Sequence, residues 1–282
     1  DPRYNKDAQK GRQDVLLGIS IALTSISALV VGLRCVTRTA VVRSFGADDW
    51  TMVAALLFAI TLLFMIIVMA YVYNLGASGF LLSLDQLVNT LKLQVAITIV
   101  YYSVLTLIKI SILMFYLRIG SIHTWFRISS KVIIGLIVMN HLVTVVVTLA
   151  QCVPLNKAWD FLGQIKHGHC IDINIFFNFI SIFHIVTDAI IISLPIKLLI
   201  NIQRPRREKI GLAFIFGLGI LSTAASIVRL HYLRVFIRSK DPFFESLPIH
   251  LTSVIEVNAG ILCASLPMLK ALLRSPQDNT TR

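Results

Sequence analysis

Long apolar stretches separated by short polar gaps dominate the chain. Seven of them are each close to the roughly 20 residues that a helix needs to cross a bilayer: Val15–Thr37, Trp50–Tyr73, Leu93–Leu117, Val132–Ala150, Asn174–Leu199, Lys209–Phe236 and Ile249–Leu273. Backbone polar groups inside lipid must bond internally, and these stretches lack the alternation of a membrane β-strand. The pattern predicts an all-α, polytopic membrane protein, a bundle of seven transmembrane helices.

Composition supports this fold class, because hydrophobic residues make up 56% of the chain and charged residues only 14%. A soluble domain carries roughly a quarter charged residues. Turn-forming residues such as Asn74, Gly76 and Pro154 fall in the polar gaps. We therefore expect an extracellular N-terminal segment over residues 1–14, a seven-helix domain over 15–273 and a cytoplasmic tail over 274–282.

The net charge of +12 does not indicate nucleic-acid binding, because the basic residues lie mainly in the gaps, as membrane topology signals do. One predicted side of the membrane holds fourteen Lys and Arg residues and the other ten. The excess predicts an N-terminus outside and a C-terminus in the cytoplasm, in the plasma membrane or an endomembrane. The basic loop with Arg204, Arg206 and Arg207 is a candidate contact for a cytoplasmic partner or anionic lipid; alternatively it only sets topology.

Two of the four cysteines, Cys152 and Cys170, fall in the predicted outer loop between the fourth and fifth spans. An oxidising compartment favours a disulfide there, although two free thiols are the alternative. Closing this loop stabilises the fold by about 3 kcal/mol in the chain-entropy model. The adjacent His167 and His169 form, with Cys170, only a weak metal pattern without an evident fourth ligand. We predict no metal site and no cofactor.

Four charged residues lie well within the apolar spans: Lys109, Asp188, Arg229 and Glu256. Charges inside a membrane are costly, usually face the bundle interior and often pair. At about 1.5 Å per residue, Arg229 and Glu256 both lie ~10 Å from the outer side, and Lys109 and Asp188 both lie ~21–24 Å from it. The depths predict two ion pairs. They form either a ligand-binding or switching network, or a set of contacts that only fixes helix packing.

Several segments, taken together, resemble the fungal integral-membrane family named for a rhodopsin-like domain. This family includes receptor-like surface-sensing proteins and membrane proteins encoded in secondary-metabolite gene clusters such as the satratoxin cluster. The resemblance implies a seven-helix bundle with an outer-loop disulfide, and indicates that the four intramembrane charges are motif positions. The matching segments are FGADDW (Phe45–Trp50), Lys109–Ile119, Cys152–Pro154 with Trp159 and Cys170–Asp172, Thr187–Leu199, KIGLAFIFGLG with Ser226–Arg229, and Ile255–Leu272.

The chain departs from the family pattern at two places: Phe80 stands where a His often follows the second helix, and Leu251 and Thr252 stand where a Trp usually precedes Glu256. A retinal Schiff base needs a buried Lys. The seventh span carries only Lys270, near its cytoplasmic end, and Lys109 lies on a different helix from the lysine of known rhodopsins. We expect no retinal, and coupling to a G protein is only an analogy from helix count.

Two functions remain open from the sequence. The first is a receptor-like protein whose small lipophilic ligand enters from outside and reaches the level of Arg229 and Glu256. The second is a membrane-embedded enzyme or accessory protein of a secondary-metabolite pathway, with Asp188 and Glu256 as candidate acid–base groups. A transporter is less favoured, because the helix count is odd and no repeat is visible.

Overall fold

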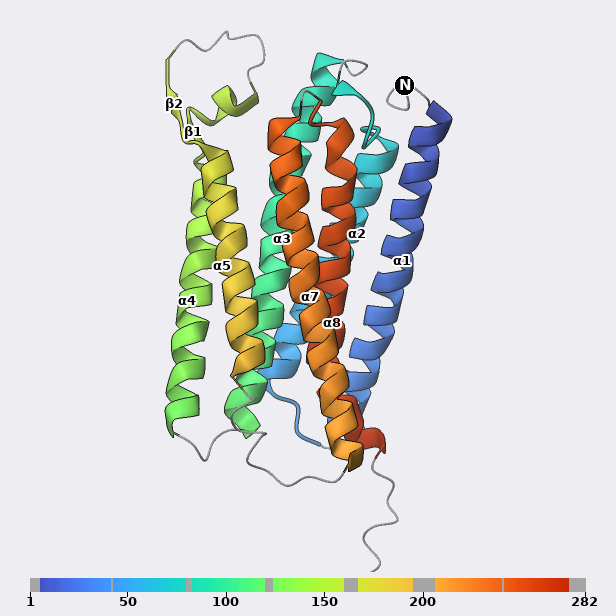
Figure 1. The fold of residues 1–282 in the computed structure, drawn as a ribbon, viewed down its shortest axis with the longest axis vertical. Coiled ribbons are helices and arrows are strands. Elements are labelled where there is room, and N and C mark those ends of the chain that lie inside the picture. Colours follow the sequence, from blue (N-terminus) through green and yellow to red (C-terminus); the bar gives the residue numbers. More distant parts are fainter. Residues whose placement is uncertain are drawn as a thin grey trace, which may run out of the picture.

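The computed structural model of the chain is a bundle of long helices that lie side by side (Figure 1). It describes residues 6–41, 43–79, 83–119, 124–159, 167–194, 206–239 and 241–273. Seven helices in these ranges are long and apolar enough to cross a membrane, which confirms the predicted fold class. They are α1 (Lys6–Val36), α2 (Ala47–Tyr71), α3 (Leu84–Ile119), α4 (Thr124–Leu149), α5 (Ile173–Ser193), α7 (Arg206–Arg238) and α8 (Leu247–Leu273).

Local hydrogen bonds explain where α5 and α3 begin. Asp172 accepts hydrogen bonds from the backbone amides of Asn174 (3.0 Å) and Ile175 (3.3 Å), and so caps the first turn of α5. A reciprocal pair of bonds between Ser83 and Gln86 starts α3. α3 therefore begins at Leu84, well before the predicted start at Leu93. The prediction missed its first turns because they are only moderately apolar.

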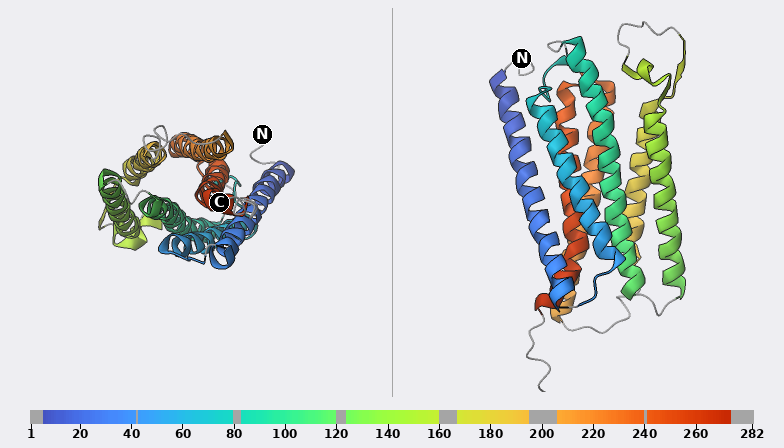
Figure 2. Two further views of the ribbon diagram at one scale, coloured as in Figure 1. Left: turned by 90° about the horizontal axis from the view of Figure 1, so that it is seen from below. Right: turned by 180° about the vertical axis from the view of Figure 1, so that it is seen from behind.

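α8 contacts α1, α2, α3 and α7, and α3 contacts as many helices, namely α2, α4, α5 and α8. Figure 2, seen from below, shows α8 between α7 and α1, with α4 at the far rim. The largest apolar core joins α1, α2, α3 and α8 and includes the fully buried Met52, Ile66, Val104 and Ile261. A smaller core holds Phe126 and Ile137 of α4 against Leu113 and Ile191. The polar groups considered next are held mainly by α8 and the helices that surround it.

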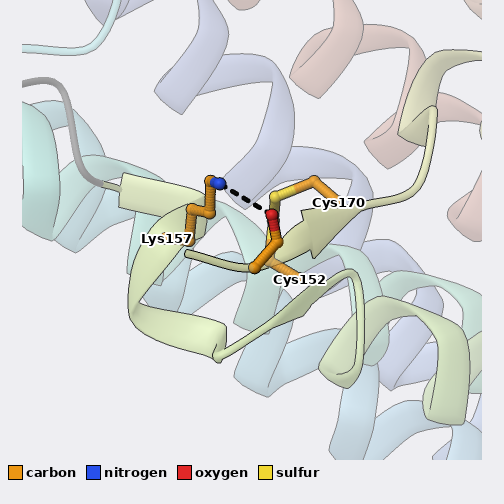
Figure 3. Close-up of a disulfide and its surroundings, with 4 residues drawn as sticks. Cys152, Lys157 and Cys170 are labelled. Atoms are coloured by element: carbon orange, nitrogen blue, oxygen red, sulfur yellow. Dashed lines mark hydrogen bonds between the residues drawn. A yellow bond between two sulfur atoms is a disulfide. The ribbon is translucent and has the colours of Figure 1, made fainter. Parts of the chain in front are cut away.

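A short hairpin lies at the end of the bundle where α1 begins, which we call the disulfide end (Figure 1). Strands β1 (Cys152–Val153) and β2 (His169–Cys170) pair antiparallel, with the two cysteines directly opposite each other. Their sulfur atoms form a disulfide with an S–S distance of 2.01 Å. Lys157 Nζ donates to the carbonyl of Gly168 at 2.8 Å and closes the same loop (Figure 3).

The disulfide confirms the predicted pairing, and it makes the Cys170 sulfur unsuitable as a thiolate metal ligand. Some sequence expectations need correction. Lys92, one residue before the predicted third span, lies on α3, with Nζ 5.6 Å from the ring centre of Trp159. α1 begins at Lys6, within the segment expected to precede the first helix. Arg204, the tail 274–282 and the side chains of Arg206 and Arg207 lie outside what the structure describes.

Candidate functional site

The carboxylate of Glu256 lies in the middle of α8 and is only 1% exposed. The hydroxyl of Tyr101 on α3 donates to Oε2 at 2.5 Å, and the hydroxyl of Ser226 on α7 donates to Oε1 at 2.6 Å. Arg229 Nε lies 3.6 Å from Oε2. Both carboxylate oxygens therefore have donors, so a buried charge that would be costly alone is compensated.

Arg229 joins α7 to three other helices. Its Nη2 donates to the Tyr102 hydroxyl of α3 at 3.1 Å and to the Ser181 hydroxyl of α5 at 3.4 Å. Its guanidinium carbon also lies 4.4 Å from the ring centre of Tyr101, in cation–π range. Together with the pair to Glu256, these contacts make Arg229 a bridge between α3, α5, α7 and α8.

Lys109 of α3 contacts residues in one turn of α5. Its Nζ donates to the Thr187 hydroxyl at 2.8 Å and to the carbonyl of His184 at 2.9 Å, and lies 3.2 Å from Asp188 Oδ1. It also lies 3.2 Å from His184 Nδ1. Asp188 is the least enclosed of these groups, with 18% of its side chain exposed.

The structure brings each predicted charge pair together, and it also joins the two levels. The ring centres of Tyr102 and His184 are 5.1 Å apart, so the partner of Arg229 contacts the partner of Lys109. Two positive and two negative side chains make the net charge of this set zero. We call it the buried network: Tyr101, Tyr102, Lys109, Ser181, His184, Thr187, Asp188, Ser226, Arg229 and Glu256.

The hydroxyls and aromatic rings of the buried network were not predicted from the sequence. Tyr101, Tyr102, Ser181 and Ser226 stand in apolar spans, where a lone hydroxyl or ring is usually a packing residue. One signal was available: Ser226 lies three residues before Arg229, so both fall on one face of a helix.

A second charged group lies at the opposite end of the bundle from the disulfide. Arg34 of α1 binds Asp49 Oδ1 through Nε at 2.9 Å and Asp48 Oδ2 through Nη2 at 3.1 Å. Arg38 pairs with the same two carboxylates at 3.1 and 3.4 Å. Arg118 of α3 lies 3.5 Å from Asp48 Oδ1 and also donates to Ser44. We call these five charged residues the Arg–Asp cluster.

Arg34 and Arg38 belong to the fourteen basic residues counted on the predicted inner side, but they are 1% and 5% exposed in contacts between helices. Without them, the basic residues on that side number twelve against ten, and the charge bias is weaker. Two signals could have revealed the cluster. Arg34 and Arg38 are one helical turn apart, and Asp48 and Asp49 lie in the first turn of α2, where carboxylates are favourable.

An apolar groove of about 400 Å³ lies between α4 and α5. Trp125 of α4 forms one wall, and α5 supplies the rest through Val186, Ala189, Ile190, Ser193 and Leu194. These α5 residues form one stripe at helical spacing, whereas Thr187 and Asp188 face the buried network. In the residues that the structure describes, no group of three or more His, Cys, Asp or Glu side chains is arranged to hold a metal.

Comparison with known proteins identifies relatives along most of the chain. Residues 33–275 match the fungal rhodopsin domain. The chain is 30% identical over 65% of its length to a SAT4 family membrane protein of Emericella nidulans. It is 25% identical over 92% of its length to the receptor GIN3 of Arthrobotrys oligospora. It is also 25% identical over 62% of its length to the Fugralins biosynthesis cluster protein 2 of Gibberella zeae.

The aligned region is only part of these relatives, covering 46% of the SAT4 family protein, 62% of GIN3 and 44% of the Fugralins cluster protein. No solved structure matches the chain.

Proposed function

The chain belongs to the fungal rhodopsin domain family, and from this premise we propose that it is a receptor-like membrane protein that senses a small lipophilic ligand. The observation that carries this proposal is the position of Arg229. Inside the bundle its guanidinium contacts Tyr102 of α3, Ser181 of α5 and Glu256 of α8. A charge that joins several helices within a membrane is typical of a functional site.

In this proposal the buried network is a switch between two helix arrangements. Both oxygens of Glu256 already have donors, so the described arrangement is the closed one. Leaving one member of a buried ion pair without its partner costs about 3–5 kcal/mol. A ligand shifts the equilibrium only by its difference in affinity for the two arrangements. It must therefore supply a donor to Glu256 or an acceptor to Arg229 in the open arrangement.

We further propose that the disulfide end faces the outside or the lumen and the opposite end faces the cytoplasm. Disulfides persist in oxidising compartments. Cys152 and Cys170 lie at the same end of the bundle as the start of α1 (Figure 1). This argument is independent of the Lys and Arg count and supports the same orientation. The basic loop with Arg204, Arg206 and Arg207 then faces the cytoplasm, where it meets a protein partner or anionic lipid.

The test uses the full chain in lipid nanodiscs, heated in the presence of a panel of medium-chain fatty acids and sesquiterpene alcohols. We expect at least one compound to raise the melting temperature saturably for the wild type, and not for Glu256→Gln or Tyr101→Phe. Tyr71→Phe is the matched control, because Tyr71 is 71% exposed. A panel without any stabilising compound, or equal stabilisation of Glu256→Gln, would contradict the proposal.

A second function, a membrane-embedded enzyme or accessory protein of a secondary-metabolite pathway, is favoured by one observation. Relatives include proteins named for the Fugralins and Satratoxin biosynthesis clusters. In this function the Glu256 carboxylate and the Tyr101 hydroxyl, 2.5 Å apart, would exchange a proton with a bound substrate. Mass spectrometry of the same incubations separates the two functions, because an enzyme converts a compound that a receptor only binds. A polyketide or terpene synthase gene beside this one would also favour the pathway function.

A further inference from the structure

We propose that Arg34 clamps a bending point of α8 and that α8 couples this clamp to Glu256. Arg34 of the Arg–Asp cluster contacts the backbone of α8 as well as the two carboxylates. While Nε and Nη2 bind Asp49 and Asp48, its Nη1 donates to the carbonyl of Ala264 at 2.7 Å. One guanidinium thereby joins α1, α2 and α8. This inference needs no ligand and stands independently of the receptor proposal.

The hydrogen bond from Arg34 to Ala264 lies next to a turn of α8 that lacks one backbone hydrogen bond. Pro267 follows three residues later and lacks the N–H that would bond the carbonyl of Cys263. Helices bend where such a bond is missing. α8 nevertheless continues to Leu273. Arg34 therefore holds α8 at its weakest turn, and the two carboxylates fix the direction of its guanidinium.

α8 also provides a stiff connection between this clamp and the buried network. Glu256 lies eight residues before Ala264, about 12 Å along a helix. Between them, Asn258 Nδ2 lies 3.5 Å from Thr24 Oγ1 of α1, and Ile261 is fully buried. A well-packed helix segment transmits a shift rather than absorbing it. A change at Glu256 is therefore expected to reach the turn that Arg34 holds.

Hydrogen exchange of the full chain in nanodiscs tests the clamp. In Arg34→Met, the backbone amides of residues 265, 266 and 268–273 should exchange about tenfold or more faster, as expected for losing a charge-assisted hydrogen bond. Arg118→Met is the matched control. It removes a guanidinium that lies 3.5 Å from Asp48 Oδ1 but leaves the hydrogen bond from Arg34 to Ala264, so it should leave this segment unchanged. Equal acceleration in both variants would overturn the clamp.

Two further variants keep the test decisive. Pro267→Ala restores the missing backbone donor, so it should make residues 265–273 insensitive to Arg34→Met. If Arg34→Met folds only with Pro267→Ala, the clamp is supported; if it folds in neither background, Arg34 serves general folding and the clamp is wrong. Coupling is tested by Glu256→Gln, which should also accelerate exchange after Ala264, non-additively with Arg34→Met. Acceleration confined to residues 247–260 would overturn the coupling.

Discussion

Replacing Glu256 by Gln removes one charge from the buried network while keeping the shape of the side chain. Arg229, 7% exposed, then has only neutral groups around it: the hydroxyls of Tyr102 and Ser181, the rings of Tyr101 and Tyr102, and the amide of the new Gln. Leaving a buried charge without its partner costs about 3–5 kcal/mol. The Tyr101 hydroxyl also loses a charged acceptor, and such bonds contribute about 1.5–3 kcal/mol. These effects overlap, so we expect a total loss of about 4 kcal/mol.

The assay is unfolding of the full chain in mixed micelles titrated with a denaturing detergent. Arg229→Gln should destabilise the protein by a similar amount, because it leaves the Glu256 carboxylate with only two hydroxyl donors. The double variant, which removes both charges, should lose at least about 2 kcal/mol less than the sum of the single losses. Asp14→Asn, at an exposed position of α1, controls for a general effect of charge.

Additivity would refute this reasoning. If the loss in the double variant equals the sum of the single losses within about 0.5 kcal/mol, Arg229 and Glu256 do not stabilise each other. The Arg229 Nε and Glu256 Oε2 atoms, 3.6 Å apart, would then contribute nothing to stability as a pair. The Glu256 carboxylate would be stabilised by the hydroxyls of Tyr101 and Ser226 alone.

Three other outcomes follow from the geometry. Lys109→Met should cost about 2–4 kcal/mol in the same assay, whereas Asp188→Asn should cost less, because Lys109 keeps Thr187 and His184 and Asp188 is partly exposed; equal losses would contradict this order. Replacing Cys152 and Cys170 by Ser should lower stability by about 3 kcal/mol. A reducing agent should lower the stability of the wild type by the same amount and leave that of the variant unchanged. Asp49→Asn should cost about 3–5 kcal/mol, but Arg118→Gln at most about 1 kcal/mol, because 34% of the Arg118 side chain is exposed and screened; the reverse order would count against the Arg–Asp cluster as described.

The seven helices and the charge pairs could be predicted because a bilayer imposes a length on each span and makes an interior charge conspicuous. Depth then paired Lys109 with Asp188 and Arg229 with Glu256, since partners in a bundle of roughly parallel helices meet at one level. The ends of α3 were less predictable, because a Ser83–Gln86 cap begins the helix before its apolar run.

The Arg–Asp cluster was missed for a physical reason. Charges near the ends of apolar spans normally lie in water, so Arg34 and Asp48 were indistinguishable from loop residues in a single sequence. Only the packing of α1 against α2 and α8 encloses them. The hydroxyls of Tyr101 and Ser226 were also hidden, because their role depends on which face of α3 and α7 meets α8.

The long sequence separation within the Lys109–Asp188 pair has a consequence for biosynthesis. Arg34 is followed within about 15 residues by the carboxylates that neutralise it, but Asp188 follows Lys109 after about 80 residues. At a synthesis rate of about 5–20 residues per second, the nascent chain carries Lys109 without its carboxylate for about 4–16 s. During that interval α3 is a span with an uncompensated cation at the insertion machinery. Synthesis of Asp188 in the fifth span ends the interval in which Lys109 lacks its carboxylate partner.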